Sequence, residues 1–203
     1  MINRRSFMAC MAAAIPVVPR PAAAHIPSEP FEVDPEYVPQ EVAFPSGYAA
    51  GTIVIDTAER FLYFVEEEGR ARRYGIGVGR AGLAWSGTAE VGRKARWPSW
   101  TPTPNMIRRE PGKYAKYADG VPGGPSNPLG SRALYLYRNG RDTYYRIHGT
   151  TEPWTIGKAV SNGCIRLINE HVEDLYERVT VGATVIVLHG KELLSGSGGA
   201  GSN

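Results

Sequence analysis

The sequence predicts a mainly β fold with one short helix near its C-terminal end. Between residues 52 and 78, short runs of β-branched and aromatic residues alternate with turns, as in a β-meander. Two further alternating runs flank Asn139 and Gly140, a dipeptide typical of tight hairpins. The segment that follows Cys164 instead repeats its apolar residues at the spacing of a helix.

The first 24 residues have the order of an export signal. Arg4 and Arg5 precede an apolar stretch at 7–18, and three small residues end at Ala24, after which we expect cleavage. The paired arginines favour a twin-arginine signal, although they also occur in ordinary secretory signals. The apolar stretch is shorter than the about 20 residues that a membrane span needs. We therefore expect an exported protein of the periplasm or cell envelope, with no transmembrane segment after signal removal.

Charge and cysteine content limit the possible functions. The net charge of +3 comes from Arg4, Arg5 and Arg20 in the predicted signal, so the mature chain is neutral and general nucleic-acid binding is not expected. Cys10 also lies in the signal, which leaves Cys164 as the lone thiol and rules out an intramolecular disulfide. A lone thiol in an oxidising compartment indicates either a chemical use or a buried, inert side chain.

The domain is expected over residues 48–189. Residues 25–47 hold five prolines and predict an extended linker. Strands are predicted at 52–55, 61–65 and around 74–78. The Gly- and Pro-rich stretch 79–130 predicts one or two short strands that carry either a lid over a site or an ordinary surface excursion.

The C-terminal half predicts a hairpin, a helix and a last strand. The hairpin strands are expected at 133–137 and 144–148, which places His148 at a strand end. Asn169 is expected to cap the helix, whose apolar stripe should pack on the sheet; the stripe is Val172, Leu175, Tyr176 and Val179. A strand at 183–188 follows, and the Gly/Ser-rich residues 190–203 predict a disordered tail.

His148 and Cys164, sixteen residues apart, form a candidate base and nucleophile. A cysteine attacks as its thiolate, which His148 could stabilise as imidazolium before returning the proton to a leaving amine. Gly163 permits a tight turn, so that the amides of Gly163 and Cys164 could form an oxyanion hole. No obvious carboxylate is available to orient the imidazole ring.

A zinc site is the rival reading of these side chains. His148, Cys164, His171 and His189 show neither the Cys-x-x-Cys nor the His-x-x-x-His spacing of metal ligands. His171 is simply a polar residue in the first helical turn, and His189 a residue at a strand end. We therefore expect no metal ion and no cofactor.

The segment 144–167 resembles the signature of the L,D-transpeptidase catalytic domain family (YkuD-like, of the ErfK/YbiS-type subgroup). In that family His-Gly-Thr, here at 148–150, leads to Ser-x-Gly-Cys-hydrophobic-Arg, here at 161–166. The similarity includes Asn-Pro-Leu-Gly at 127–130 and the Trp- and Pro-rich stretch 97–104. It covers about 140 residues, from position 48 to position 189.

The resemblance implies a β-sandwich or open barrel with the thiol at the end of a groove. Cys164 would attack the carbonyl between meso-diaminopimelate and D-Ala of a peptidoglycan tetrapeptide stem and release D-Ala. The resulting thioester would pass to an amine, forming a cross-link or exchanging a D-amino acid. His148 would be general base and acid, and the Gly149 carbonyl would orient its ring. The residues expected to bind substrate, or to support the loop that carries Cys164 (the Cys loop), are Arg166, Ser161, Asn162 and Trp154.

Several alternatives remain open at this point. Many family members have His where this chain has Asn162, which cannot titrate, so that position is structural or substrate-facing. The acyl acceptor could also be a lipoprotein lysine or water. Rivals to a transpeptidase are a non-catalytic wall-binding module and a papain-like protease. Trp97, Trp100 and Trp154 could line the groove or simply anchor their loops.

Overall fold

A nine-stranded sheet links the β-rich runs of the sequence. The computed structural model describes residues 31–45, 47–67, 69–81, 83 and 85–188. The large sheet consists of β1 (Gln40–Ala43), β2 (Ile53–Asp56), β3 (Phe61–Val65), β4 (Arg70–Gly75), β6 (Gly87–Arg96), β7 (Arg132–Arg138), β8 (Arg141–His148), β10 (Ile165–Arg166) and β11 (Thr184–Val187). A second sheet pairs β5 (Val78–Gly79) with β9 (Ala159–Ser161). The predicted mainly β class is confirmed.

The strand order brings the two halves of the domain together. The order is β1-β4-β3-β2-β11-β6-β7-β8-β10, so the C-terminal strand β11 lies between the meander and the hairpin region. Most neighbours are antiparallel, but β11 pairs with β2 and β10 pairs with β8 in parallel. The second of these parallel pairs carries the chain that follows Cys164 alongside the end of β8.

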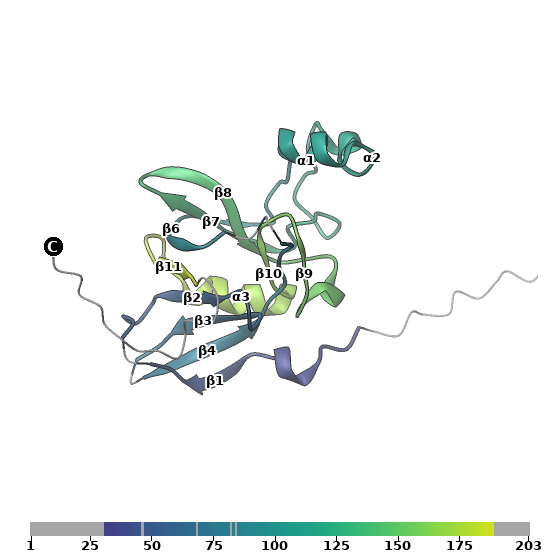
Figure 1. The fold of residues 1–203 in the computed structure, drawn as a ribbon. Helices are drawn as coiled ribbons and strands as arrows, with labels where there is room; N and C mark the ends of the chain where they lie inside the picture. Colours follow the sequence, from purple (N-terminus) through teal and green to yellow (C-terminus); the bar gives the residue numbers. More distant parts are fainter. Residues whose placement is uncertain (1–30, 46, 68, 82, 84, 189–203) are drawn as a thin grey trace, which may run out of the picture. The chain divides into compact units, whose positions relative to one another are not determined.

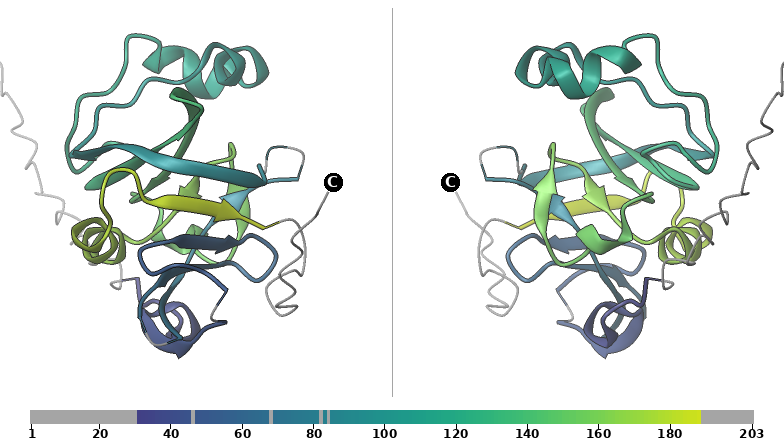
Figure 2. Two further views of the ribbon diagram at one scale, coloured as in Figure 1. Left: turned by 90° about the vertical axis from the view of Figure 1, so that its left-hand side faces the viewer. Right: turned by 90° about the vertical axis from the view of Figure 1, so that its right-hand side faces the viewer.

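The helices are short: α1 and α2 lie next to each other, and α3 lies apart from them (Figure 2). They are α1 (Pro104–Arg109), α2 (Pro111–Tyr114) and α3 (Asn169–Arg178), with 3₁₀ turns η1 (Pro35–Tyr37), η2 (Ala115–Tyr117) and η3 (Pro153–Thr155). The expected helix after the Cys loop is α3. The sequence prediction missed α1 and α2, because helices of six and four residues are too short to show helical periodicity.

The core lies between the sheet and α3. Apolar side chains with little or no exposure fill it, and burying one aliphatic side chain stabilises the folded state by about 1.5–3 kcal/mol. The core residues include Ile53, Ile55, Leu62, Tyr74, Ile76, Val91, Leu134, Leu136, Ile147, Leu167, Val172 and Leu175. Val172 and Leu175 belong to the predicted stripe of α3, and Tyr176 packs against the core from a partly buried position. The expected packing of the apolar stripe of this helix on the sheet is confirmed.

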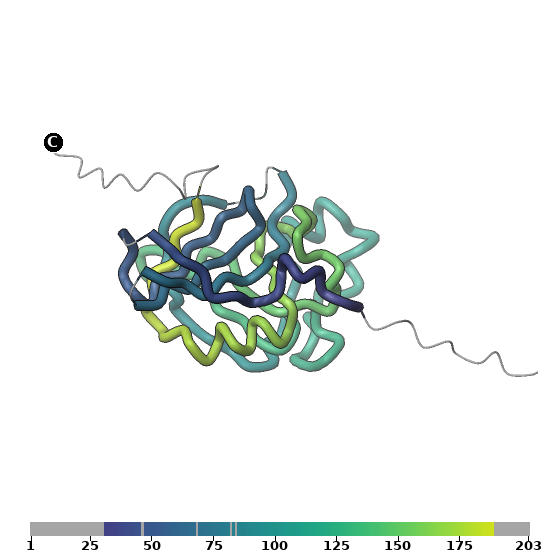
Figure 3. The backbone as a smooth tube through the Cα atoms, turned by 90° about the horizontal axis from the view of Figure 1, so that it is seen from below, coloured from purple at the N-terminus to yellow at the C-terminus, as the bar shows by residue number. Residues whose placement is uncertain are grey.

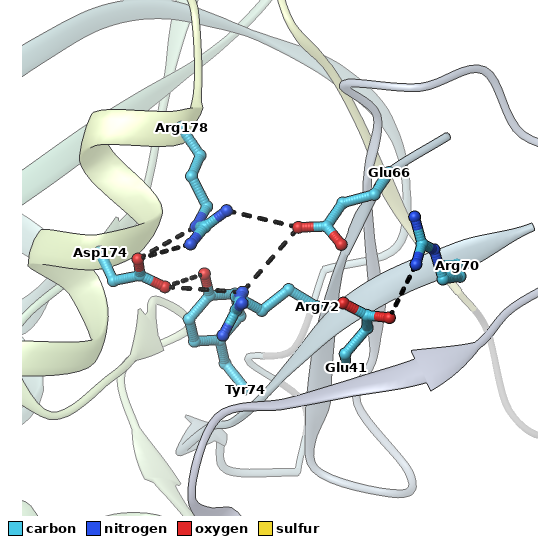
Figure 4. A network of polar contacts seen from close by, with 7 residues as sticks. All are labelled: Glu41, Glu66, Arg70, Arg72, Tyr74, Asp174 and Arg178. Atoms are coloured by element: carbon cyan, nitrogen blue, oxygen red, sulfur yellow. Dashed lines mark hydrogen bonds and ion pairs between the residues drawn. The ribbon is translucent and has the colours of Figure 1, made fainter. Parts of the chain in front are cut away.

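A polar network also joins α3 to the sheet (Figure 4). The Tyr74 hydroxyl donates a hydrogen bond of 2.7 Å to Asp174 on α3, and Arg178 donates one of 3.0 Å to the same carboxylate. Arg72 lies between Glu66 and Asp174, at 3.9 and 4.0 Å. The buried tyrosine therefore gains a hydrogen-bond acceptor for its hydroxyl group, as a buried polar group requires.

Three local expectations differ from the structure. Asn169 does not cap α3; its Oδ1 atom accepts a hydrogen bond of 3.1 Å from the Ser131 amide instead, and Ile168 occupies the cap position. The third meander strand lies at Arg70–Gly75 rather than around 74–78; three arginines accompany the buried Ala71 and Tyr74 there, so the segment shows little apolar signal in the sequence. The long stretch after Gly79 contains the ten-residue strand β6 as well as α1 and α2.

The folded unit begins earlier than the sequence indicated. Within the expected linker 25–47, β1 runs alongside β4 and pairs antiparallel with it (Figure 3). Phe44, which follows β1, is buried. An edge strand needs only one partner, so a Pro-rich segment can supply one where Pro39 precedes it. The predicted signal at 1–24 and the tail at 190–203 lie outside the described residues. In the described part of the chain, no helix has the length and apolar character needed to cross a membrane.

Candidate active site

A pocket of about 1040 Å³ brings Cys164 and His148 together at the end of β8. Its walls come from β8, from the Cys loop and from the segment that carries α1 and α2. The parallel pairing of β10 with β8 sets Arg166 opposite His148. The Leu167 amide donates to the His148 carbonyl at 2.8 Å, which fixes the Cys loop against the strand.

A wide bulge in β8 presents backbone atoms to the thiol. Asp142 pairs with Tyr137 and Arg146 pairs with Tyr135, so residues 143–145 stand opposite a single residue of β7. Tyr144, at the middle of the bulge, has a φ of 63° and is 72% exposed. Its carbonyl oxygen lies 3.9 Å from the Cys164 Sγ atom. Left-handed backbone in a bulky residue is uncommon and often occurs at functional sites.

Burial controls the protonation of His148. The side chain is only 4% exposed, and its burial, with the nearby Arg166 charge second, lowers the pKa of His148 to about 3. The carbonyls of Gly149 and Leu129 favour the protonated ring but do not outweigh these effects. His148 Nδ1 lies 2.5 Å from the Gly149 carbonyl oxygen. Because a carbonyl only accepts, Nδ1 carries the proton, and Nε2 is the basic nitrogen.

The thiol is also neutral in the resting site. Burial raises the pKa of Cys164, while the Arg146 amide, the Arg146 guanidinium and Arg166 oppose this rise. Cys164 Sγ therefore has a carbonyl acceptor from Tyr144 on the bulge and an amide donor from Arg146, the residue that follows the bulge. The imidazolium expected from the sequence is not the resting form of His148. Proton transfer from sulfur to the ring would accompany attack on a substrate.

The Cys loop is held by Ser161. Its hydroxyl donates to the Cys164 carbonyl at 2.6 Å and accepts from the Gly163 amide at 3.1 Å. Gly163 has a φ of 119°, which an L side chain rarely adopts. The Gly163 amide, one of the two expected oxyanion donors, is thus engaged with Ser161 in the structure; the other expected donor is the Cys164 N–H. That amide donates no hydrogen bond to any residue in the described ranges.

Asn162 connects the Cys loop to the helical insertion, which we define as residues 104–117. Its Oδ1 atom accepts hydrogen bonds of 3.2 Å from both Arg80 and Arg109, and its Nδ2 atom donates one of 2.7 Å to the Tyr114 hydroxyl. Arg80 also pairs with Glu110 at the start of α2. Asn162 is thus a structural link and also lines the pocket.

Sequence comparison identifies the family. A profile described as "YkuD: L,D-transpeptidase catalytic domain" matches residues 50–187. The chain belongs to this family. The probable L,D-transpeptidase ErfK/SrfK of Escherichia coli K12 is 39% identical over 160 residues, covering 74% of this chain and 48% of that protein. The probable L,D-transpeptidase YbiS of the same strain is 38% identical over 153 residues, covering 73% and 47%.

Solved structures with the same fold include one from Brucella melitensis, described as a probable carnitine operon oxidoreductase. It is 56% identical, covers 77% of this chain and 96% of that chain, and has a TM-score of 0.53. A structure described as the Ldtfm-avibactam carbamoyl enzyme has a TM-score of 0.51 at 17% identity, covering 70% of this chain and 50% of that one, and shows the fold alone. The chain spans about half the length of the curated relatives it matches.

Arg166, within the family signature, binds protein rather than solvent. Its Nη1 atom lies 2.7 Å from Glu152 Oε2 and 3.5 Å from Thr155 Oγ1, so it fixes the loop between His148 and Cys164. Trp154 in that loop is 53% exposed and is not among the residues that line the pocket, so its substrate-binding role stays a prediction. Trp97 also lies outside the pocket lining.

Trp100 is the tryptophan that lines the pocket, and it packs edge-on against Tyr114 and Tyr117 of the helical insertion. Among the described residues, no cluster of three or more His, Cys, Asp or Glu is placed to hold a metal ion. His171 lies on α3 and His189 lies outside the described residues. Sequence reasoning missed Tyr144 and Arg146 of the YkuD-type site, because their roles depend on a bulge.

Proposed function

We propose that this chain is an L,D-transpeptidase that acylates Cys164 with a peptidoglycan stem peptide and transfers the acyl group to an amine. The observation that carries this proposal is one pocket lined by both Cys164 and His148, in which Cys164 Sγ faces the Tyr144 carbonyl of the β8 bulge and the His148 ring is oriented by Gly149. The family's transpeptidase names support the chemistry. The predicted export signal would place the chain in the envelope, where stems are found.

The site can perform both half-reactions with its own groups. His148 Nε2 takes the thiol proton as sulfur attacks the carbonyl carbon between diaminopimelate and D-Ala. Cys164 N–H donates to the oxyanion that forms. The C–N bond then breaks, and His148 returns the proton to the departing D-Ala amine. A second amine attacks the thioester, gives its proton to His148, and sulfur leaves to regain the proton.

The acceptor defines which product forms. A diaminopimelate amine gives a cross-link, a D-amino acid gives exchange, a lipoprotein lysine gives attachment, and water gives hydrolysis. Each acceptor needs only access to the thioester from the open pocket. Mass spectrometry of muropeptides incubated with each candidate acceptor in turn distinguishes these products.

The decisive test is intact-mass spectrometry of the reduced protein after incubation with a disaccharide-tetrapeptide. We expect an acyl adduct on the unmutated protein with release of D-Ala, and neither with Cys164→Ala. Circular dichroism of both proteins controls for folding. Stem binding without an adduct on reduced protein would instead identify a wall-binding module, and cleavage of all-L peptides would identify a general protease.

A further inference from the structure

The helical insertion gives one wall of the pocket an excess of positive charge. The five cations that line the pocket are Arg109, Lys113, Lys116, Arg146 and Arg166. Glu152 is the one carboxylate in the same lining. Such an imbalance on the walls of a concave site attracts an anionic ligand.

Two of these cations are already neutralised. Arg146 forms ion pairs of 2.7 and 2.8 Å with Asp142, and Arg166 forms one of 2.7 Å with Glu152. Arg109, Lys113 and Lys116 differ, because no carboxylate of the described residues lies within ion-pair distance of them. The unneutralised charge therefore belongs to the helical insertion.

Aromatic rings support the two lysines. The Lys113 Nζ atom lies 5.2 Å from the centre of the Tyr114 ring, and the Lys116 Nζ atom lies 4.9 Å from that of Tyr117. Tyr114 is buried and packs on Trp100, so the rings belong to the folded wall. Each ammonium group thus lies over a ring face, and because a ring forms no conventional hydrogen bond with it, its N–H donors remain available to a ligand.

Asn162 ties this charge to the reactive centre. It accepts a hydrogen bond from Arg109 and donates one to Tyr114, and it stands two residues before Cys164. The position of the cationic wall relative to the nucleophile is therefore fixed by side chains. A ligand held on this wall would meet the thiol at a defined distance along its chain.

We propose that Arg109, Lys113 and Lys116 form a subsite that binds a carboxylate of a stem peptide. This subsite selects stem peptides whose non-terminal carboxylates are free over the same peptides with those carboxylates amidated. This inference rests on the proposed transpeptidase function. The carboxylate can belong to the donor stem or to the acceptor stem. Amidation removes the negative charge with little change in size, so it isolates the electrostatic contribution.

The experiment compares two donors: a tetrapeptide with free carboxylates and its analogue with the non-terminal carboxylates amidated. For the unmutated protein we expect amidation to raise KM for acylation by about tenfold, with kcat little changed, since a charge-assisted contact is lost. The variant with Arg109→Gln, Lys113→Gln and Lys116→Gln should bind both peptides equally weakly. Arg108→Gln is the matched control, because Arg108 lies on α1 outside the pocket lining.

Two further measurements separate the possible failures. Calorimetry of both peptides with Cys164→Ala measures their binding affinities without turnover. The subsite is therefore tested even if the unmutated protein shows no acylation. A second series, with amidated acceptor and free donor, assigns the carboxylate to donor or acceptor through the transfer step. Equal affinity for free and amidated peptides in both series would overturn the subsite. So would an Arg108→Gln variant that weakens peptide binding as much as the triple variant does. Single lysine variants replace the triple variant if its thermal unfolding shows misfolding.

Discussion

Asp142 and Arg146 form a bidentate ion pair across the bulge of β8, with oxygen to nitrogen distances of 2.7 and 2.8 Å. In a regular strand, residues four apart are separated by about 13 Å, so this pair can form only because the bulge shortens the path. Tyr144 lies between them, with its carbonyl near the Cys164 thiol. The ion pair therefore braces the backbone that faces the nucleophile.

Replacing Arg146 by Gln should raise the pKa of the Cys164 thiol further. The Arg146 guanidinium favours the thiolate, and its loss also frees Asp142, whose charge disfavours it. We expect the rate of alkylation by iodoacetamide at neutral pH to fall at least a few-fold, and its pH profile to move to higher pH. Arg141→Gln is the control, since Arg141 is an exposed residue of the same strand. Identical profiles for the two variants would contradict a role of Arg146 at the thiol.

His148 should remain neutral throughout the physiological range. Burial lowers its pKa to about 3 from the ordinary 6.5, so its ring signals in NMR spectra should show no titration between pH 5 and 8. Between pH 6.5 and 3 the unfolded chain binds a proton that the folded chain does not, so stability should fall as pH falls through this window. His148→Asn should reduce that slope in thermal unfolding. A ring that titrates near 6.5 in the folded protein would contradict the buried neutral site.

The sequence predicted the strands because their signals are local, and the catalytic roles of Cys164 and His148 stay predictions, although both side chains line one pocket. Short runs of β-branched and aromatic residues mark β2 and β3, and the Asn139–Gly140 turn marks the β7–β8 hairpin. The bulge could not be predicted, because it depends on how many residues of β8 face each residue of β7. For the same reason Asp142 and Arg146 gave no signal, as they are too far apart on a regular strand.

The helical insertion escaped prediction for a different reason. Thr103 caps α1 through the Met106 amide at 3.2 Å, and Pro104 and Pro111 open α1 and α2 at positions where proline is favoured. These start signals are present in the sequence, but no run of apolar residues follows them. The substrate-binding role of Trp154 stays a prediction, because an aromatic residue near a catalytic loop does not reveal from sequence which way its ring points.

Replacing Asn162 by Ala should detach the helical insertion from the Cys loop. The change removes hydrogen bonds to Arg80, Arg109 and Tyr114, each worth about 0.5–1.5 kcal/mol. We expect acylation efficiency to fall roughly tenfold, mainly through KM, and limited proteolysis within 104–117 to become faster. Asn162→Asp keeps an oxygen toward both arginines and should restore most of the loss. If Asn162→Asp lowers acylation efficiency as much as Asn162→Ala does, the hydrogen bonds from the two guanidinium groups do not account for the loss.

The Asp174 network should make stability depend on acid pH in a defined way. Partial burial opposes the charge of Asp174, but hydrogen bonds from Arg178 and Tyr74 outweigh it and lower the pKa of Asp174 below its usual 3.8. The folded state therefore binds this proton less readily than the unfolded state. The stabilisation is present above the usual pKa and is lost as pH falls through the lower, folded-state pKa.

Tyr74→Phe and Asp174→Asn test this coupling between α3 and the sheet. Tyr74→Phe removes one donor to the carboxylate and should destabilise the fold by about 1–2 kcal/mol at pH 7 in urea unfolding. The deficit of Asp174→Asn relative to the unmutated protein should be constant from pH 7 to about 5 and shrink below about 4. Glu177→Gln is the control, since this exposed residue of α3 pairs with Arg96 outside the network. A deficit that stays the same at pH 3 would mean that packing, and not the charge of Asp174, accounts for the loss.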